Sequence, residues 1–419
     1  MSTCPFASRR GFLAGVGGLA GAGMLRPARA DTAAPPSVEP FYGARQGGSL
    51  TPSQSHTYLA VFDLNATQAT QVAALLKLWT AAAARMAAGQ PAGPPSADPN
   101  APDGDSGDAL GLPPSRLTLT FGFGPGLFVK DGKDRYGLAS RRPEALADLP
   151  RFNGDQLLEA RTGGDISVQA CADDPQVAFH AVRQLSRLSY GMAALRWAQA
   201  GFSSSPPDES TGRNLMGFKD GTANPVARPT AGVKPDEVVW IGGEGPDWLR
   251  GGSYVVVRRI RISLEHWDRT DTEFQEQVIG RRKRSGAPLG SAAEFDPPDF
   301  AATDKDGNPL IPDDAHVRLA NPANVGGASI LRRGYSYNDG LSFTAERWPP
   351  WRQGMMYDAG LLFVAYQRDP RTGFIRIFEP MAKLDALNQF STHVGSGLFA
   401  VPPGVAQGES IGQTLFDAA

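Results

Sequence analysis

The strongest constraint on the fold is an order of strand and helix signals that occurs twice along the chain. In the first half, an alternating strand signal at 56–64 precedes a helix signal at 66–88, where apolar residues recur at helical spacing. In the second half, the order begins again with a strand signal at 252–262. A strand–helix–strand…strand–helix order is typical of a ferredoxin-like fold, in which helices cover one face of an antiparallel sheet. The sequence therefore predicts an α+β protein with two ferredoxin-like domains, of the dimeric α/β-barrel-like type.

The remaining elements follow from local signals, and two helix starts are predicted from residue type, with Thr67 and Ser263 as N-caps. Residues 89–114 and 281–314 are rich in Pro, Gly and Asp and are predicted to be loops. The other predicted strands are 117–123, 165–171, 361–366 and 397–401, and the other predicted helices are 175–200, 264–280 and 383–390.

Four segments are predicted along the chain. They are a signal peptide at 1–30, an extended N-terminal segment at 31–55, an N-terminal ferredoxin-like domain at 56–213 and a C-terminal ferredoxin-like domain at 214–419. The length suits two domains of ordinary size, each able to bury its own core.

The first thirty residues have the pattern of a twin-arginine signal. Arg9 and Arg10 precede an uncharged, glycine-rich stretch, and Ala28-Arg29-Ala30 offers a cleavage site. The alternative is a membrane anchor, but the uncharged stretch at 11–25 is shorter than the roughly 20 apolar residues that a spanning helix needs. We therefore expect export to the periplasm or beyond the inner membrane, without stable membrane insertion. The twin-arginine route carries folded proteins, many of which already hold a cofactor.

Charge and cysteine content exclude several classes of site. Removal of residues 1–30 takes away four arginines and no acidic residue, so the formal net charge changes from −2 to −6. This balance argues against a nucleic-acid partner. Cys4 lies in the signal, so Cys171 alone remains, which excludes an internal disulfide and any site built from several cysteines. We interpret Cys171 as a small buried apolar residue.

Three segments contain side chains suited to chemistry at a metal. In 216–225, Gly217, Gly221 and Pro225 constrain the backbone around Asp220 and so present one carboxylate rigidly. His316 follows the acidic pair at 313–314, and a nearby carboxylate could take its Nδ1 proton and leave Nε2 free for iron. From spacing alone, an ordinary hydrogen-bonded role for His316 stays open. The third segment is Leu331-Arg332-Arg333-Gly334-Tyr335.

Together these segments resemble the signatures of the dye-decolourising peroxidases. The matching strings are Gly217-Phe-Lys-Asp-Gly-Thr-Ala-Asn-Pro225, the His316 segment, Arg332-Arg333-Gly334-Tyr335-Ser336-Tyr337 and Gly360-Leu-Leu-Phe-Val-Ala-Tyr-Gln367. Further strings at 252–254, 267–270, 279–281 and 285–290 are similar to the branch that includes the exported deferrochelatase/peroxidase of bacterial ferrous-iron uptake systems. The resemblance extends from about residue 55 to the C-terminus.

The resemblance implies one haem b per subunit, bound in the C-terminal domain. It assigns His316 as the proximal ligand of the iron, Asp220 as the distal carboxylate and Arg332, the first of its pair, as the distal arginine. We further expect Gly221 and Thr222 to contribute to the cofactor site, and Arg281 either to pair with a haem propionate or to make an ordinary salt bridge. Leu362 and Phe363 could line the distal pocket or belong to the core.

The sequence departs from the family at one place, since Ala323 stands where relatives have an arginine after Asn-Pro. Histidine ligation and polar distal groups suit a peroxidase. Asp220 would move a proton of hydrogen peroxide, and Arg332 would stabilise developing negative charge, which predicts an acidic pH optimum.

The main hypothesis is therefore a haem peroxidase that uses hydrogen peroxide to oxidise an organic donor. The alternatives are a deferrochelatase, which releases iron from haem with the tetrapyrrole intact, and a haem carrier without catalytic turnover. We expect a homo-oligomer, and components of ferrous-iron uptake as possible partners.

Overall fold

The computed structural model describes residues 38–204, 211–225, 234–342 and 355–417. The signal predicted at 1–30, the beginning of the segment predicted at 31–55 and part of the junction near residue 213 lie outside the described residues. Among the residues within these ranges, no helix is both long enough and apolar enough to cross a membrane.

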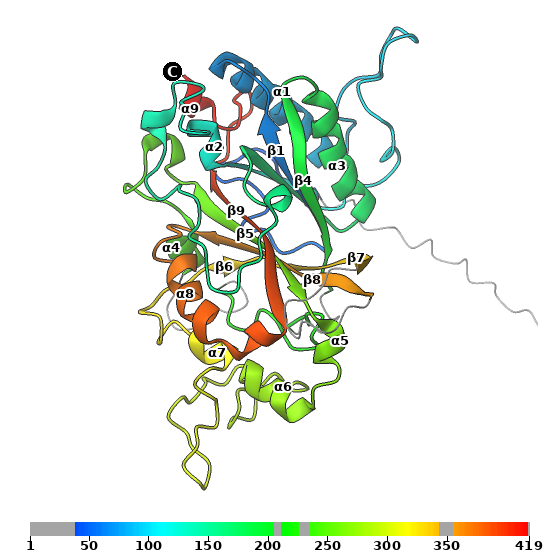
Figure 1. The fold of residues 1–419 in the computed structure, drawn as a ribbon. Helices are drawn as coiled ribbons and strands as arrows, with labels where there is room; N and C mark the ends of the chain where they lie inside the picture. The colour runs from blue at the N-terminus through cyan, green and yellow to red at the C-terminus, as the bar shows by residue number, and fades with distance from the viewer. Residues whose placement is uncertain (1–37, 205–210, 226–233, 343–354, 418–419) are drawn as a thin grey trace, which may run out of the picture. The chain divides into compact units, whose positions relative to one another are not determined.

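The first half of the chain forms a four-stranded antiparallel sheet with two helices on one face (Figure 1). Its strands stand in the order β2-β3-β1-β4, so the first strand is central and pairs with the third and the fourth. Helices α1 and α3 lie side by side, and α3 packs on β1 and β3. The elements are β1 (His56–Leu64), α1 (Ala69–Ala87), β2 (Thr118–Phe123), β3 (Ile166–Ala172), α3 (Pro175–Leu188) and β4 (Ala193–Phe202).

The second half repeats this arrangement. Its first strand, β5, pairs with β8 and with β9, and β7 pairs with the other edge of β8. The elements are β5 (Ser253–Ile262), α5 (Leu264–Trp267), α6 (Thr272–Ile279), β6 (Leu331–Arg332), β7 (Tyr335–Ser342), β8 (Met356–Gln367), α8 (Phe374–Leu384) and β9 (Ser391–Val401). The prediction of two ferredoxin-like units is confirmed, because each half has the same strand order.

Short helices fill several of the connections. The short α-helices are α2 (Pro125–Phe128), α4 (Pro235–Val239), α7 (His316–Leu319) and α9 (Gln413–Phe416). The 3-10 helices are η1 (Ala139–Arg141), η2 (Glu159–Arg161), η4 (Asp247–Leu249) and η5 (Ala386–Gln389).

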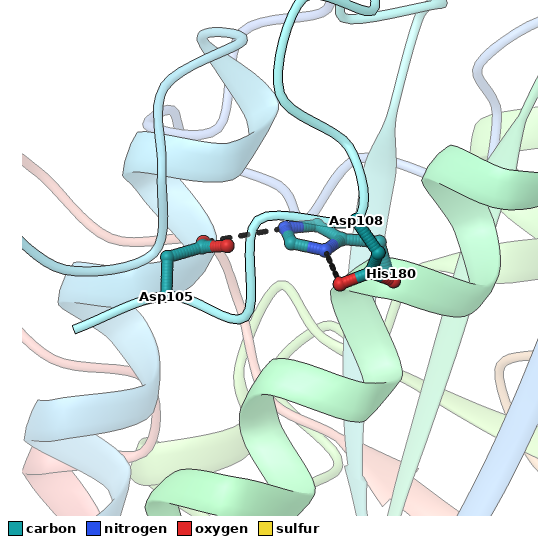
Figure 2. A group of neighbouring side chains, drawn as sticks. All are labelled: Asp105, Asp108 and His180. Carbon is teal, nitrogen blue, oxygen red and sulfur yellow. Dashed lines mark hydrogen bonds and ion pairs between the residues drawn. The ribbon is translucent and has the colours of Figure 1, made fainter. Parts of the chain in front are cut away.

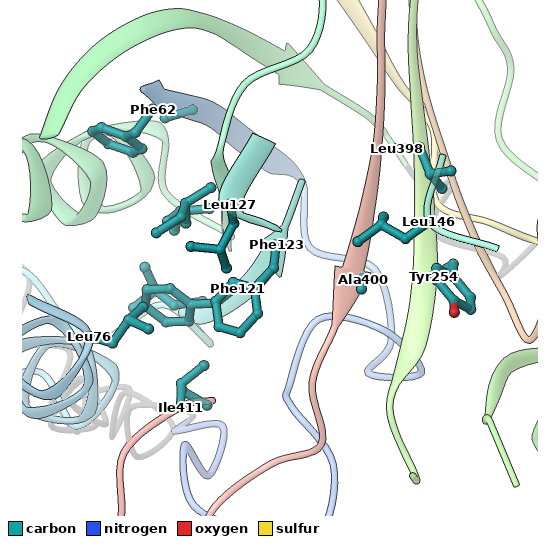
Figure 3. Close-up of a cluster of buried hydrophobic side chains, with 14 of the residues drawn as sticks. Phe62, Leu76, Phe121, Phe123, Leu127, Leu146, Tyr254, Leu398, Ala400 and Ile411 are labelled. Carbon is teal, nitrogen blue, oxygen red and sulfur yellow. The ribbon is translucent and has the colours of Figure 1, made fainter. Parts of the chain in front are cut away.

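The two sheets join edge to edge into one closed system of strands. One seam is the pair Phe123–Ala400, between β2 and β9, and the other is the pair Phe202–Ser336, between β4 and β7. Apolar side chains between the sheets form one core, which includes Leu362. A larger core lies beneath the helices, where aromatic residues of β1 and β2 face α1 (Figure 3). Each sheet is therefore buried on both faces.

Three of the predicted helices differ in extent from the observed ones. The helix predicted at 175–200 ends at Leu188, because Gly191 takes a positive φ of 80° and the chain turns into β4. The helix predicted at 264–280 is two helices, because the side chain of Asp271 accepts a hydrogen bond from Phe274 N and starts α6 anew. The helix predicted at 383–390 is the end of α8 followed by η5.

Of the two predicted caps, Thr67 is wrong by one residue and Ser263 is right in position. Helix α1 begins after Gln68 rather than Thr67, because the Gln71 side chain accepts hydrogen bonds from both of their main-chain N–H groups. Ser263 stands at the start of α5, but its side chain makes no capping hydrogen bond there.

The loop at 89–114 is attached to α3 through His180 (Figure 2). Asp108 Oδ1 lies 2.9 Å from Nδ1 of this histidine, and Asp105 Oδ2 lies 3.3 Å from Nε2. The two carboxylates thus approach opposite nitrogens of one ring. Asp105 also accepts hydrogen bonds from the main-chain N–H groups of Ala92 and Gly107. The cluster therefore holds the loop on the helix.

Candidate active site

The turn that carries Asp220 is rigid. Gly217 and Gly221 have φ values of 84° and 128°, which favour glycine. The Asp220 main-chain N–H donates to Gly212 O at 2.9 Å. Asn214 accepts hydrogen bonds from the main chain of the turn, and its side-chain amide also donates to Asp220 Oδ2 at 3.4 Å. The predicted presentation of a single fixed carboxylate agrees with these contacts.

Arg332 is brought to Asp220 by a reciprocal contact between their two segments. Asn224, in the same turn as Asp220, accepts from Arg332 N at 3.0 Å and donates to Arg332 O at 2.8 Å. Arg332 Nη1 then donates to Asp220 Oδ1 at 2.6 Å. The carboxylate and the guanidinium therefore form one ion pair, although 112 positions separate them in the sequence.

His316 is the first residue of α7 and has a carboxylate partner that the sequence did not reveal. Its Nδ1 lies 2.7 Å from Asp385 Oδ2. Asp385 follows the last residue of α8, and its other oxygen accepts from Leu387 N at 2.8 Å. The acidic pair at 313–314 does not provide the partner. Asp313 instead pairs with Arg318, and the main-chain oxygen of Asp314 accepts from Ala386 N.

Neighbouring charges shift the pKa values of Asp220 and His316. Burial raises the pKa of Asp220, but the charge and the hydrogen bond of Arg332 outweigh burial and hold this pKa below its usual value. Burial likewise lowers the pKa of His316, and Asp385 outweighs it, so the pKa of His316 lies above its usual value. Asp220 and Arg332 both act on the pKa of His316. The Asp220–Arg332 pair therefore lies close enough to His316 for its charges to influence the ring.

The arrangement around His316 fits an axial ligand of haem iron. Because the Asp385 carboxylate can only accept, the single proton of the neutral His316 ring belongs on Nδ1, which leaves the lone pair on Nε2. No described residue hydrogen-bonds to Nε2. The His316 side chain is 35% exposed, whereas that of Asp385 is 3% exposed. The ring is thus fixed at one nitrogen and open at the other.

Glu294 holds the Asp220 turn from two sides and was not foreseen from the sequence. Lys219 Nζ forms an ion pair with Glu294 Oε2, and Thr222 Oγ1 donates to Glu294 Oε1 at 2.9 Å. Arg281 Nη1 donates to the main-chain oxygens of Gly286 and Glu294, at 2.7 and 2.9 Å. Thr222 and Arg281 therefore have structural partners, and their contacts with a cofactor remain predictions, as does that of Gly221.

The register of β8 separates Leu362 from Phe363. Arg332 pairs with Ala365, and alternate strand residues share a face, so Phe363 lies on the face of Arg332. The Phe363 ring lies 5.6 Å from that of Phe374 on α8. Leu362 points the other way and is fully buried between the sheets. Of the two alternatives for Leu362, core packing is therefore the one that the structure shows.

Comparisons with known proteins agree with the geometry. The family profile described as Dyp-type peroxidase, N-terminal, matches residues 46–203, and the profile described as Dyp-type peroxidase, C-terminal, matches residues 211–406. The chain is 39% identical to a dye-decolorizing peroxidase of Thermobifida fusca, over 98% of this chain and 97% of that protein. It is 38% identical to a deferrochelatase of Yersinia pestis, over 98% of this chain and 95% of that protein.

A solved structure supports the same grouping. The X-ray generated oxyferrous/water mixed complex of DtpA from Streptomyces lividans superposes with a TM-score of 0.80 at 42% sequence identity. The match covers 91% of this chain and 98% of that chain.

Proposed function

Since this chain belongs to the Dyp-type peroxidase family and is a haem peroxidase, we propose that His316, Asp220 and Arg332 are the residues with which it binds haem and handles hydrogen peroxide. Two contacts support the proposal: Asp385 holds His316 at Nδ1, and Arg332 pairs with Asp220, whose charge in turn influences His316.

Each residue has a role that its surroundings support. His316 Nε2 would bind the iron, and Asp385 would keep the proton on Nδ1 and strengthen the ligand. The haem supplies the redox chemistry between peroxide and donor. Asp220 takes a proton from one oxygen of hydrogen peroxide and returns it to the leaving oxygen. Arg332 keeps its own proton and offers a fixed positive charge where negative charge develops.

The finer points of function are proposals of the same kind. We infer haem b as the form of the cofactor, because the family resemblance implies it. Export through the twin-arginine pathway is inferred from residues 1–30, and a homo-oligomer is inferred from the family. Release of iron from haem is the second candidate activity, because relatives at 37–38% identity are named deferrochelatases. Components of ferrous-iron uptake would then be its partners.

Absorption spectra of the purified protein test the ligand assignment. We expect a stoichiometric Soret band in the wild-type protein and its loss or a changed ligand signature in His316→Ala. His56→Ala, at the start of β1, is the control and should leave the spectrum unchanged. A histidine-ligated Soret band that persists in His316→Ala would refute the assignment.

A second measurement separates the two activities. Anaerobic incubation with haem, followed by fluorescence detection of metal-free protoporphyrin, would show iron release. Steady oxidation of a dye by hydrogen peroxide without protoporphyrin would show that peroxidase turnover is the main activity.

A further inference from the structure

In a second histidine, His393, a charged side chain contacts Nδ1, as in His316, but the direction of the hydrogen bond is opposite. In His316, Nδ1 meets a carboxylate, which accepts. In His393, on β9, Nδ1 lies 2.9 Å from Arg258 Nε, which can only donate. The His393 Nδ1 must therefore accept, and the ring proton belongs on Nε2. One ring thus offers a lone pair at Nε2, and the other offers an N–H donor there.

Arg258 fixes this tautomer because it is itself held firmly. Its side chain is fully buried, pairs with Asp155 and donates from Nη1 to Ser396 Oγ at 3.1 Å. Burial and the Arg258 charge hold the pKa of His393 well below its usual value. His393 is therefore a neutral donor at physiological pH, with a positive charge behind it.

His393 lies on the face of the second sheet that carries Phe363 and Arg332. Arg258 pairs directly with Phe363 across β5 and β8, so their side chains share that face. The His393 ring lies 4.7 Å from Phe378 of α8. The same helix carries Phe374, which contacts Phe363, and ends beside Asp385, the partner of His316.

The donor at Nε2 has no protein acceptor. Within the described part of the chain, no residue hydrogen-bonds to His393 Nε2, and His393 is half-buried rather than sealed in the core. His316 and Asp220 are half-buried as well. A bound group can therefore reach all three residues.

We propose that His393 Nε2–H donates a hydrogen bond to a propionate carboxylate of the bound haem. The proposal rests on the proposed haem function. An ionised carboxylate is attracted to a neutral N–H that is backed by the Arg258 charge, whereas the lone pair of His316 Nε2 repels it and attracts the iron. The two histidines thereby distinguish the two ends of one ligand and orient it.

The test measures the rate at which haem leaves the ferric holoprotein for apomyoglobin. His393→Phe keeps an aromatic ring against Phe378 but removes the donor, and His393→Gln keeps an amide donor. We expect loss of haem to be about 10–100-fold faster in His393→Phe, the range for a lost hydrogen bond to a charged group, and close to the wild-type rate in His393→Gln.

The same measurement with haem dimethyl ester, whose propionates carry no charge, isolates the contact. The ester carbonyl still accepts a hydrogen bond, but a weaker one, so the difference between His393→Phe and the wild-type protein should shrink with this ester. Equal rates with ordinary haem, or an undiminished difference with the ester, would overturn the proposal while leaving haem binding by His316 intact. A wild-type protein that takes up no haem at all would instead overturn the proposed function.

Discussion

Asp385→Asn is the most informative substitution, because it changes a single charge behind the proposed iron ligand. Two unit charges at the observed 2.7 Å would interact by about 6 kcal/mol at an effective dielectric constant of about 20. A neutral imidazole N–H carries only part of a unit charge, so the real effect is smaller. Loss of a partner behind a metal-bound histidine lowers metal affinity about 10–100-fold, which corresponds to ~1.4–2.7 kcal/mol.

Asn is close to Asp in shape, so its side chain can still accept from Leu387 N and preserve the start of η5. The assay is titration of the apoprotein with ferric haem, together with the reduction potential of the iron. We expect weaker ferric haem binding by the factor above and a higher potential, because a less basic imidazole stabilises the ferric state less.

Asp314→Asn is the matched control, since this exposed acid is close to His316 in sequence but does not contact its ring. It should leave affinity and potential unchanged. Equal values for Asp385→Asn and the wild-type protein would refute the reasoning that the 2.7 Å contact tunes the ligand. A large effect of Asp314→Asn would refute it as well.

Three further predictions follow from the same site. Asp220→Asn removes the proton carrier, and Arg332→Leu removes the stabilising charge. Both variants should keep the Soret band but react with hydrogen peroxide at least about 100-fold more slowly in stopped-flow measurements. Unchanged rates would contradict their roles. The lowered pKa of Asp220 means that the carboxylate stays ionised to a lower pH than an ordinary aspartate. The acid limb of the peroxide reaction should therefore move to higher pH in Arg332→Leu, which removes the strongest of the influences that lower this pKa; a limb at the same pH in both proteins would contradict this sign. Glu294→Gln should lower the free energy of unfolding by about 2 kcal/mol in denaturant titration, because it leaves Lys219 partly buried without its counter-charge. The control is Glu244→Gln, in an exposed ion pair, which should change the free energy of unfolding by less than about 1 kcal/mol. Equal effects would argue against a special role for the Glu294 contact.

Local patterns predicted the fold class well and the ends of helices poorly. The alternation at 56–64 and the apolar run at 361–366 identified strands, because each strand places its side chains on defined faces. The segment that became β4 was predicted as helix, because its small and apolar residues also suit a helical face. Only pairing with β1 decides between the two states.

By itself, the sequence determined the presence of two ferredoxin-like units and of the three segments that contain Asp220, His316 and Arg332. Glycines that require positive φ and strings of successive residues are local properties, and they can be read along the chain. Tertiary structure alone decided the partners of these residues. Asp385 lies 69 positions beyond His316, Asn224 lies 108 positions before Arg332, and Arg258 lies 135 positions before His393. Such contacts depend on sheet register and on where helix α8 ends, and no local spacing specifies them. Each partner also decides which ring nitrogen carries the proton, so the chemistry of the two histidines is set by the fold.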